Sequence, residues 1–200
     1  MTRCIAYDAS VQKEAPQAGR PRSEEARQAV LHAVDDLLLE VGYAAMTMKG
    51  IAERARVGRQ TVYRWWSTKA EILLEASADD AAQELAVADD ADGVEALRRY
   101  LEALATFLTT SPAGAAYRAL LAAAQHDVAV ARLVAERDPV TDSARAAVSS
   151  LTAVRLAVPP EEAAARLVGP TVFWVLTGHD PKLLSFEHLA AAALRELFIE

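Results

Sequence analysis

Residues 47–69 read TMKGIAERARVGRQTVYRWWSTK, and this stretch predicts two short helices around a tight turn. Thr47 is a residue type that caps helix N-termini, and the helix after it has apolar residues at helical spacing, namely Met48, Ile51, Ala52 and Ala55. Gly58 can begin the second helix, which turns Val62 and Trp66 inward. Only Arg56 and Val57 separate the two helices. They must therefore cross steeply, and one end of the second helix projects.

The projecting helix carries residue types that bind a DNA duplex. An arginine fork can bond guanine O6 and N7, a glutamine can pair with adenine N6 and N7, and Thr or Tyr hydroxyls can donate to phosphate. Lys69 lies where a further helix begins, so its ammonium and free backbone N–H groups can hold a phosphate. The candidate DNA-binding residues are Thr47, Lys49, Arg59, Gln60, Thr61, Tyr63, Arg64, Trp65 and Lys69. A solvated basic helical hairpin is the plainer alternative.

These residues resemble a known protein family. The pattern consists of Thr-x-x-x-Ile-Ala at 47–52, then Val57, Thr61-Val62-Tyr63, Trp66 and Lys69-x-Glu71. It is similar to the DNA-binding domain of tetracycline-repressor (TetR) family regulators over residues 20–76. Residues 118–127, 167–170 and 177–178 resemble a C-terminal ligand-binding type that is common in that family. The resemblance implies a homodimeric repressor that binds a palindromic double-stranded DNA operator and is released by a small-molecule effector.

Two positions depart from the family pattern. Arg56 stands where the family usually has Gly, and a non-Gly residue held in the left-handed conformation costs about 1–2 kcal/mol. We therefore expect the turn to be adjusted. Gly58 stands where Ser usually caps the recognition helix, but Gly is an acceptable N-cap. Neither change removes a DNA-facing donor.

The composition predicts an all-α protein. Of the 200 residues, 52% are hydrophobic, which suffices for one sizeable core, or for a small domain and a larger one. Long Ala/Leu-rich segments alternate with Pro, Gly, Ser or Asp, and no alternating β-branched run has strand length. We expect a flexible N-terminal arm (1–18), a three-helix helix-turn-helix DNA-binding head (19–69), and a larger α-helical ligand-binding and dimerisation body (70–200). The names head and body refer to these ranges below.

The charge distribution supports the assignment of the head to DNA. The whole chain has a formal net charge of −7. Residues 19–69 hold nine Lys/Arg against six Asp/Glu, whereas residues 70–200 hold ten against twenty. The basic end should therefore face the duplex, and the acidic body should lie away from it.

The N-terminal segment contains no apolar run long enough for a signal peptide or a membrane span. Cys4 is the sole cysteine, so we expect no internal disulfide, no Cys-based zinc site, and a cytoplasmic location without membrane association. Ser23 can cap a first helix that ends at Gly42. Arg20 and Arg22 can reach a phosphate or the minor groove, with simple solvation as the alternative.

The body should contain helices near 94–110, 113–125, 127–137, 139–156, 160–177 and 185–198. A helix from Ser67 or Thr68 towards Leu85 should join head and body, and in the resembled family this helix carries ligand-driven motion. The best mixture of apolar walls and polar groups for a ligand cavity comprises Tyr100, Phe107, Tyr117, Arg118, Gln125 and Trp174. By the resemblance, the last two helices form the dimer interface, with candidates Leu167, Phe173, Leu194 and Leu197. Their apolar faces suit an internal core equally well.

An enzyme is the main rival class. The conspicuous pairs are His126-Asp127 and His179-Asp180, whose adjacent side chains diverge on a helix. No metal-ligand spacing and no phosphate-binding Gly-rich loop is present, so we expect no catalytic residue, no metal and no cofactor. A second rival is a helical small-molecule-binding protein that has lost specific DNA recognition. Retention of Thr61, Tyr63 and Lys69 together argues against it.

Overall fold

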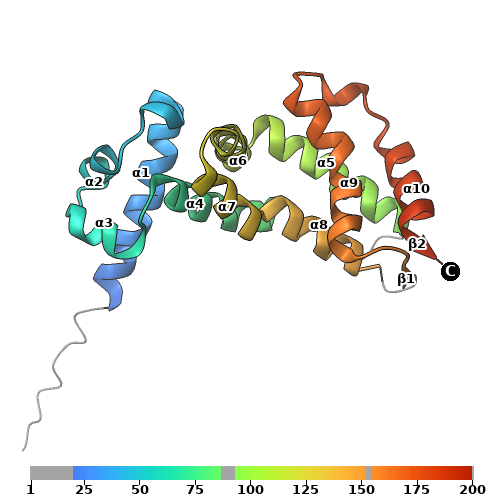
Figure 1. The fold of residues 1–200 in the computed structure, drawn as a ribbon, viewed down its shortest axis with the longest axis horizontal. Helices are drawn as coiled ribbons and strands as arrows, with labels where there is room; N and C mark the ends of the chain where they lie inside the picture. The colour runs from blue at the N-terminus through green and yellow to red at the C-terminus, as the bar shows by residue number, and fades with distance from the viewer. Residues whose placement is uncertain (1–19, 87–92, 152–154, 200) are drawn as a thin grey trace, which may run out of the picture.

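The computed structural model describes residues 20–86, 93–151 and 155–199, and most of these residues lie in helices (Figure 1). The helices are α1 Arg20–Ala45, α2 Met48–Ala55, α3 Arg59–Trp65, α4 Lys69–Glu84, α5 Gly93–Thr110, α6 Pro112–Ala124, α7 Val128–Glu136, α8 Pro139–Ser149, α9 Pro160–Leu176 and α10 Phe186–Leu197, with a 3-10 turn η1 Pro181–Leu183 before α10. The all-α prediction is confirmed. No described helix is long and apolar enough to cross a membrane. The predicted arm with Cys4, and the side chains of Arg20 and Arg22, lie outside the described part.

The first helix differs at its start from the prediction. It begins at Arg20, so Ser23 lies inside α1 and is not its N-cap. Pro21 lies in the first turn, where a missing backbone N–H costs nothing, which allows the earlier start. Near the other end, Gly42 has φ 74° and ψ 163°, so the regular helix breaks there, as the sequence predicts.

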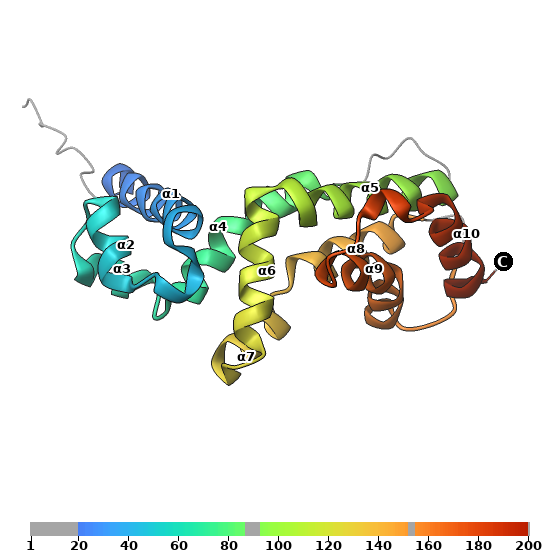
Figure 2. The ribbon, with the colours of Figure 1, turned by 90° about the horizontal axis from the view of Figure 1, so that it is seen from above.

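Two apolar cores hold the chain together. The head core is built from α1, α2 and α3 around Ile51 and Val62, and the body core from α5, α8, α9 and α10 around Leu101 and Leu104. In both views α1–α3 lie at one end and α8–α10 at the other, with α4 leading from the first group to the second (Figure 1, Figure 2). Both α4 and α6 contribute side chains to both cores. The expected boundary at residue 69 therefore coincides with the start of a helix that the two cores share.

A close contact joins α5 to α6. Ser111 caps α6, with its Oγ accepting from the backbone N–H groups of Ala113 (3.1 Å) and Gly114 (3.3 Å). A Cβ added at Gly114 would lie 1.8 Å from the main-chain oxygen of Phe107, so only glycine fits at this position. This approach fixes the angle at which α6 leaves α5.

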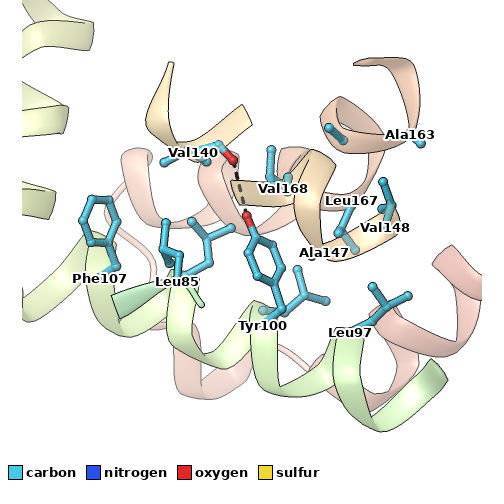
Figure 3. Close-up of a cluster of buried hydrophobic side chains, with 14 of the residues drawn as sticks. Leu85, Leu97, Tyr100, Phe107, Val140, Ala147, Val148, Ala163, Leu167 and Val168 are labelled. Carbon is cyan, nitrogen blue, oxygen red and sulfur yellow. Dashed lines mark hydrogen bonds between the residues drawn. The ribbon is translucent and has the colours of Figure 1, made fainter. Parts of the chain in front are cut away.

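The body core is mostly aliphatic and encloses the hydroxyl of Tyr100. Figure 3 shows the Tyr100 side chain on α5 pointing towards α8, with its hydroxyl against the main-chain oxygen of Val140. The hydroxyl also lies 2.9 Å from Ser143 Oγ. These two partners satisfy a polar group whose residue is only 2% exposed.

One helix is shorter than predicted. We expected a helix over 139–156, but α8 ends at Ser149. Ser150 Oγ donates to the main-chain oxygen of Ala147 (2.8 Å), a local bond that competes with helix continuation. Beyond it, β1 Arg155–Leu156 pairs antiparallel with β2 Phe198–Ile199. This two-residue ladder ties the end of α10 to the segment before α9.

Candidate functional sites

The turn between α2 and α3 has the geometry of a glycine C-cap although it contains arginine. Arg56 adopts the left-handed conformation, with φ 57° and ψ 36°. Its backbone N–H donates to the oxygen of Glu53 (3.2 Å), and that of Val57 donates to the oxygen of Ala52 (3.0 Å). This bond pattern is a Schellman motif. The expected adjustment of the turn is therefore not seen, and Arg56 itself takes the strained conformation.

The helix before the turn is fixed by a cap and a salt bridge. Thr47 Oγ1 accepts from the Gly50 N–H (3.0 Å), so its predicted role as N-cap of α2 is confirmed. At the other end of α2, the Arg54 guanidinium pairs with the carboxylates of Glu40 and, at 3.3 Å, Asp36 on α1. These contacts, with buried Ile51, hold α2 as a fixed base for α3.

One face of α3 consists of exposed polar side chains. Val62 is fully buried beneath the helix, whereas Arg59, Gln60, Tyr63 and Arg64 are all exposed. In the described ranges the side chains of Arg59, Gln60 and Tyr63 form no hydrogen bond or ion pair. The α3 face, defined by these four exposed residues, is therefore free to contact a partner outside the chain.

The remaining candidate DNA-binding residues around α3 are more buried or have neighbours within the chain. Trp65 is half-buried and meets Trp66 edge to face, with ring centroids 5.4 Å apart, while the Arg64 guanidinium lies 5.1 Å from the Trp65 ring centroid. Thr61 is half-buried. Lys49 is exposed at the start of α2, 3.7 Å from Glu53. Trp65 thus packs mainly against its own domain.

Lys69 has internal partners that the sequence did not indicate. Its Nζ donates to the main-chain oxygens of Tyr43 (2.6 Å) and Met46 (2.9 Å) and lies 4.3 Å from the Tyr43 ring centroid. Burial lowers the pKa of the Lys69 ammonium. The predicted phosphate contact would have to compete with these bonds.

A second anchor joins the head core to α4. Trp66 is buried, and its indole N–H donates to Glu75 Oε2 (2.9 Å). Glu75 in turn pairs with Arg27 of α1 at 2.5 Å. At the start of α4, Thr68 Oγ1 accepts from the Glu71 N–H, and the Glu71 carboxylate accepts from the Ser67 N–H (2.7 Å). This reciprocal cap explains why Lys69-x-Glu71 follows the recognition helix.

A cavity of about 560 Å³ lies between α6, the start of α8 and the second half of α9. Three of the six predicted ligand residues, Tyr117, Arg118 and Gln125, line it together. Its other lining residues are Leu121, Ala122, Asp138, Val140, Thr141, Ala165, Val168, Gly169, Val172 and Leu176. The volume lies within the roughly 300–1,000 Å³ of small-molecule sites. A further cavity of about 480 Å³ between α4 and α8 is lined mostly by small side chains, alanines and serines, and contains none of the predicted residues.

Burial dominates the electrostatics of the α6–α8–α9 cavity. Burial raises the pKa of Tyr117, and the negative charge of nearby Asp138 raises it further, so this phenol stays protonated. Asp138 caps α8, with its carboxylate accepting from the Val140 N–H (3.0 Å) and from Thr141 Oγ1 (2.7 Å). The Asp-Pro pair at 138–139 is a helix-start signal that could have placed Asp138 near this site from the sequence.

The other predicted ligand residues lie elsewhere. Tyr100 and Phe107 belong to the body core and are not part of the cavity lining. The Trp174 indole N–H donates to the main-chain oxygen of Asp180 (2.9 Å), and its ring lies 4.4 Å from that of His179. Trp174 therefore closes the loop after α9.

The four dimer candidates differ in exposure. Leu167 and Leu197 are 3% and 1% exposed in the single chain and belong to the body core. Figure 3 shows Leu167 beside Ala147 and Val148 in that core. Leu194 is half-buried against the core, whereas Phe173 is 67% exposed. Phe173 is thus the candidate whose side chain most clearly offers a surface to a second chain.

The two His-Asp pairs have local structural roles. Asp127 caps α7 through its bonds to the Ala129 and Val130 N–H groups, and Asp180 caps η1. His126 lies in the turn after α6, and His179 lies in the loop after α9. Across the described ranges, no group of three or more His, Cys, Asp or Glu side chains could hold a metal ion.

The fold and the exposed α3 face define an all-helical helix-turn-helix protein whose second part contains a ligand-sized cavity. Residues 30–76 match the model for bacterial regulatory proteins of the tetR family. This part of the chain is therefore similar to the DNA-binding domain of TetR family regulators, and the described chain shares the fold of a TetR family transcription regulator.

Similar proteins support this assignment. The uncharacterized HTH-type transcriptional regulator YdeS of Bacillus subtilis (strain 168) is 41% identical over 109 residues, which is 54% of this chain and 54% of that protein. The match thus spans about half the length of this curated relative. The crystal structure of the TetR family transcription regulator SCO0332 is 27% identical and has a TM-score of 0.62, covering 84% of this chain and 94% of its own. AibR, solved in complex with isovaleryl coenzyme A and operator DNA, shares the fold at 21% identity and a TM-score of 0.51, covering 86% and 98%.

Proposed function

We propose that this chain is a cytoplasmic transcriptional regulator that binds a palindromic DNA operator as a homodimer. One observation carries the proposal. The α3 face presents two arginines, a glutamine and a tyrosine, and all four side chains are exposed above the buried Val62. Such side chains match base edges and phosphates of a major groove. Their helix is held by the turn after α2 and by the buried Val62.

Within this proposal the four residues have different tasks. Gln60 lies at the N-terminal end of α3, the end that enters a groove first in helix-turn-helix proteins, so we assign it to a base edge. Arg59 and Arg64 reach base edges or phosphates, and the Tyr63 hydroxyl donates to phosphate. Thr47, Lys49, Thr61 and Trp65 lie around this face and support or extend it. Lys69 is the weakest member of the predicted set because its donors are already used within the head.

A direct test is selection of bound fragments from a genomic DNA library, followed by titration on the selected duplex. We expect half-sites about one helical turn or slightly more apart, and affinity that falls steeply with salt. Gln60→Ala and Arg64→Ala should each cost about 1–3 kcal/mol per lost base contact and relax preference at one symmetric pair of positions. Arg195→Ala, which removes an exposed positive charge on α10, is the matched control and should change neither property.

Equal affinity for a scrambled duplex at all salt concentrations would contradict DNA recognition. Binding of small molecules without such recognition would then favour the alternative, a ligand-binding helical protein. The left-handed Arg56 weighs against that alternative, because the turn keeps its Schellman bonds despite the substitution.

We further propose release from the operator by a small molecule bound in the α6–α8–α9 cavity. AibR, in complex with isovaleryl coenzyme A and operator DNA, offers a precedent within this fold. Here α6 places Tyr117 and Arg118 at the cavity, while Ala116 and Leu120 of the same helix pack in the head core. A ligand that shifts α6 therefore acts directly on the packing behind the DNA-binding helices. By this route the protein acts as a repressor whose effector changes the separation of the two α3 helices.

Dimerisation is proposed through α9 and α10. One recognition helix reads only a few base pairs, so useful specificity needs two. Exposed Phe173 and its neighbour on the next turn, Leu176 (47% exposed), give an apolar surface on α9, and half-buried Leu194 lies on α10. Sedimentation should show a dimer for the wild type and a monomer for Phe173→Asp. A wild type that stays monomeric at micromolar concentration would rule this interface out.

A further inference from the structure

The α6–α8–α9 cavity is lined by an arginine that forms no ion pair in the described structure. Arg118 is half-buried on α6 and lines the cavity beside Gln125, two turns further along the helix. Across residues 20–86, 93–151 and 155–199, the structure gives the Arg118 side chain neither an ion pair nor a hydrogen bond. Removing a guanidinium from water is costly unless an anion or acceptors replace the water. In the described structure no lining residue forms such a bond with Arg118.

The acidic residue at the same cavity is already engaged. Asp138 accepts hydrogen bonds from Val140 N–H and Thr141 Oγ1, and its position as N-cap places its charge at the positive end of α8. The negative charge of Asp138 is therefore balanced within the chain. The positive charge of the Arg118 guanidinium is not. This asymmetry favours a ligand that brings a negative charge over one that brings a positive charge.

The α9 wall and part of the α6 wall are apolar. Leu121, Val168, Val172 and Leu176 bring branched aliphatic side chains from α6 and α9. At Gly169 an added Cβ would meet no heavy atom within 4 Å, so the wall there is open space. A ligand that fills this volume gains free energy by burying its own apolar surface.

We infer that the effector is an amphipathic carboxylate. Its anionic end pairs with the Arg118 fork, which matches a carboxylate through two parallel hydrogen bonds, and its apolar body lies along α9. The inference depends on the proposed use of this cavity as the effector site, and it adds the chemical class of the ligand. The cavity volume of about 560 Å³ accommodates a medium-length acyl chain or a substituted aryl acid.

The test compares matched probes that differ only in charge, at concentrations below micelle formation. Octanoate, octanamide and octylamine, and 4-phenylbutyrate with its amide, are titrated into the full chain by calorimetry and in an operator-release assay. At least one carboxylate should bind about tenfold or more tightly than its amide, and its amine counterpart should bind weakest. Arg118→Gln should abolish this preference while leaving amide binding unchanged.

Two variants serve as controls. Arg132→Gln removes an exposed arginine of α7 that is not part of the cavity lining, and it should keep the preference for carboxylate. Gly169→Leu projects a side chain into the open wall and should weaken all probes together. Circular dichroism and thermal melts confirm that each variant folds.

The inference is overturned if no carboxylate binds the wild type, if amide or amine binds as well as carboxylate, or if Arg118→Gln retains the preference. It is also overturned if Gly169→Leu binds the carboxylate with unchanged affinity, because the ligand then lies elsewhere. Operator binding by the ligand-free protein is measured separately. If that binding is specific while the carboxylates fail, the proposed regulator survives and only the ligand class is wrong. If an amide or amine releases the protein from the operator, the cavity remains the proposed effector site, but the inference that the effector is an anion is wrong.

Discussion

The Lys69 ammonium lies 2.6 Å from the main-chain oxygen of Tyr43 and 4.3 Å from the centroid of the Tyr43 ring. The first contact satisfies a carbonyl just beyond the break in α1 at Gly42, and the second places a cation over an aromatic face. Because Lys69 is the first residue of α4, this pair fastens the end of α1 to the helix that leads into the body.

Loss of the Lys69 ammonium should therefore reduce stability. In Lys69→Met the aliphatic stem remains, but the oxygens of Tyr43 and Met46 lose their donor, so we expect the free energy of unfolding to fall by about 1–3 kcal/mol. Urea unfolding measures this. Lys49→Met removes an exposed lysine with one distant carboxylate neighbour and should change stability little. A stable Lys69→Met variant with a lower salt slope for DNA binding would instead support the phosphate contact.

The left-handed Arg56 should respond favourably to glycine. Arg56→Gly removes the steric cost of a Cβ at φ 57° but adds freedom to the unfolded chain, so we expect a net gain of about 1 kcal/mol. The measurement is the urea midpoint at constant m-value. Arg54→Gly, two residues earlier and inside α2, is the contrasting variant and should lose stability, because it removes the contacts to α1 and lowers helix propensity. A loss in Arg56→Gly would show that the arginine side chain makes a compensating contact.

Gly114 and Gly169 offer a matched pair of helical glycines. A Cβ at Gly114 would lie 1.8 Å from the oxygen of Phe107, so Gly114→Ala must push α5 and α6 apart, and we expect a loss of at least about 2–3 kcal/mol. A Cβ at Gly169 meets nothing, so Gly169→Ala should gain about 0.5–1 kcal/mol from helix propensity. Thermal unfolding of both variants checks the prediction. Equal effects would mean that the α5–α6 contact relaxes freely.

The raised pKa of the Asp35 carboxyl predicts that the stability of the head depends on pH. Burial, followed by the negative charge of Asp80 on α4, raises the pKa of this carboxyl to about 6, and the neighbouring His32 opposes the shift. Since the folded form then holds its proton more tightly than the unfolded chain, this group's contribution to the free energy of unfolding decreases as pH rises from about 4 to about 6. It stays low above that range.

Asp35→Asn, which is uncharged at every pH, should thus be more stable than the wild type at pH 7.5 and nearly equal to it at pH 4. Urea unfolding across this range measures the difference. Glu25→Gln, an exposed acidic residue of the same helix, should show no such trend. A wild type whose difference from Asp35→Asn does not vary with pH would refute the raised pKa.

Local signals predicted most helices closely. Four helices are capped by the residue before them, namely Thr68, Ser111, Asp127 and Ser185. Each capping bond joins residues two or three apart in the sequence, which is why composition and spacing sufficed. The end of α8 was missed because serines at 149–150 are compatible with both a helix interior and a helix end.

Contacts between residues far apart in the sequence could not be predicted from such local signals. The partners of Lys69 lie more than twenty residues earlier in the chain, and no periodicity encodes that contact. In α9, apolar residues occur around much of the helix, so the sequence did not reveal that Leu167 faces the core while Phe173 faces outward. The three ligand candidates that line one cavity, Tyr117, Arg118 and Gln125, lie on α6 or at its C-cap, where spacing alone brings them together.

The exposed side chains of α3 can be substituted at little cost to the stability of the fold. Arg59, Gln60 and Tyr63 have no partner within the described chain, and helix α3 is anchored from beneath by Val62. Substitution at these positions therefore carries little folding penalty, since exposed sites away from caps and cores are usually neutral. If the α3 face binds DNA as proposed, changes on that face alone can alter the DNA sequence that a gene copy recognises, while its framework and cavity stay as they are.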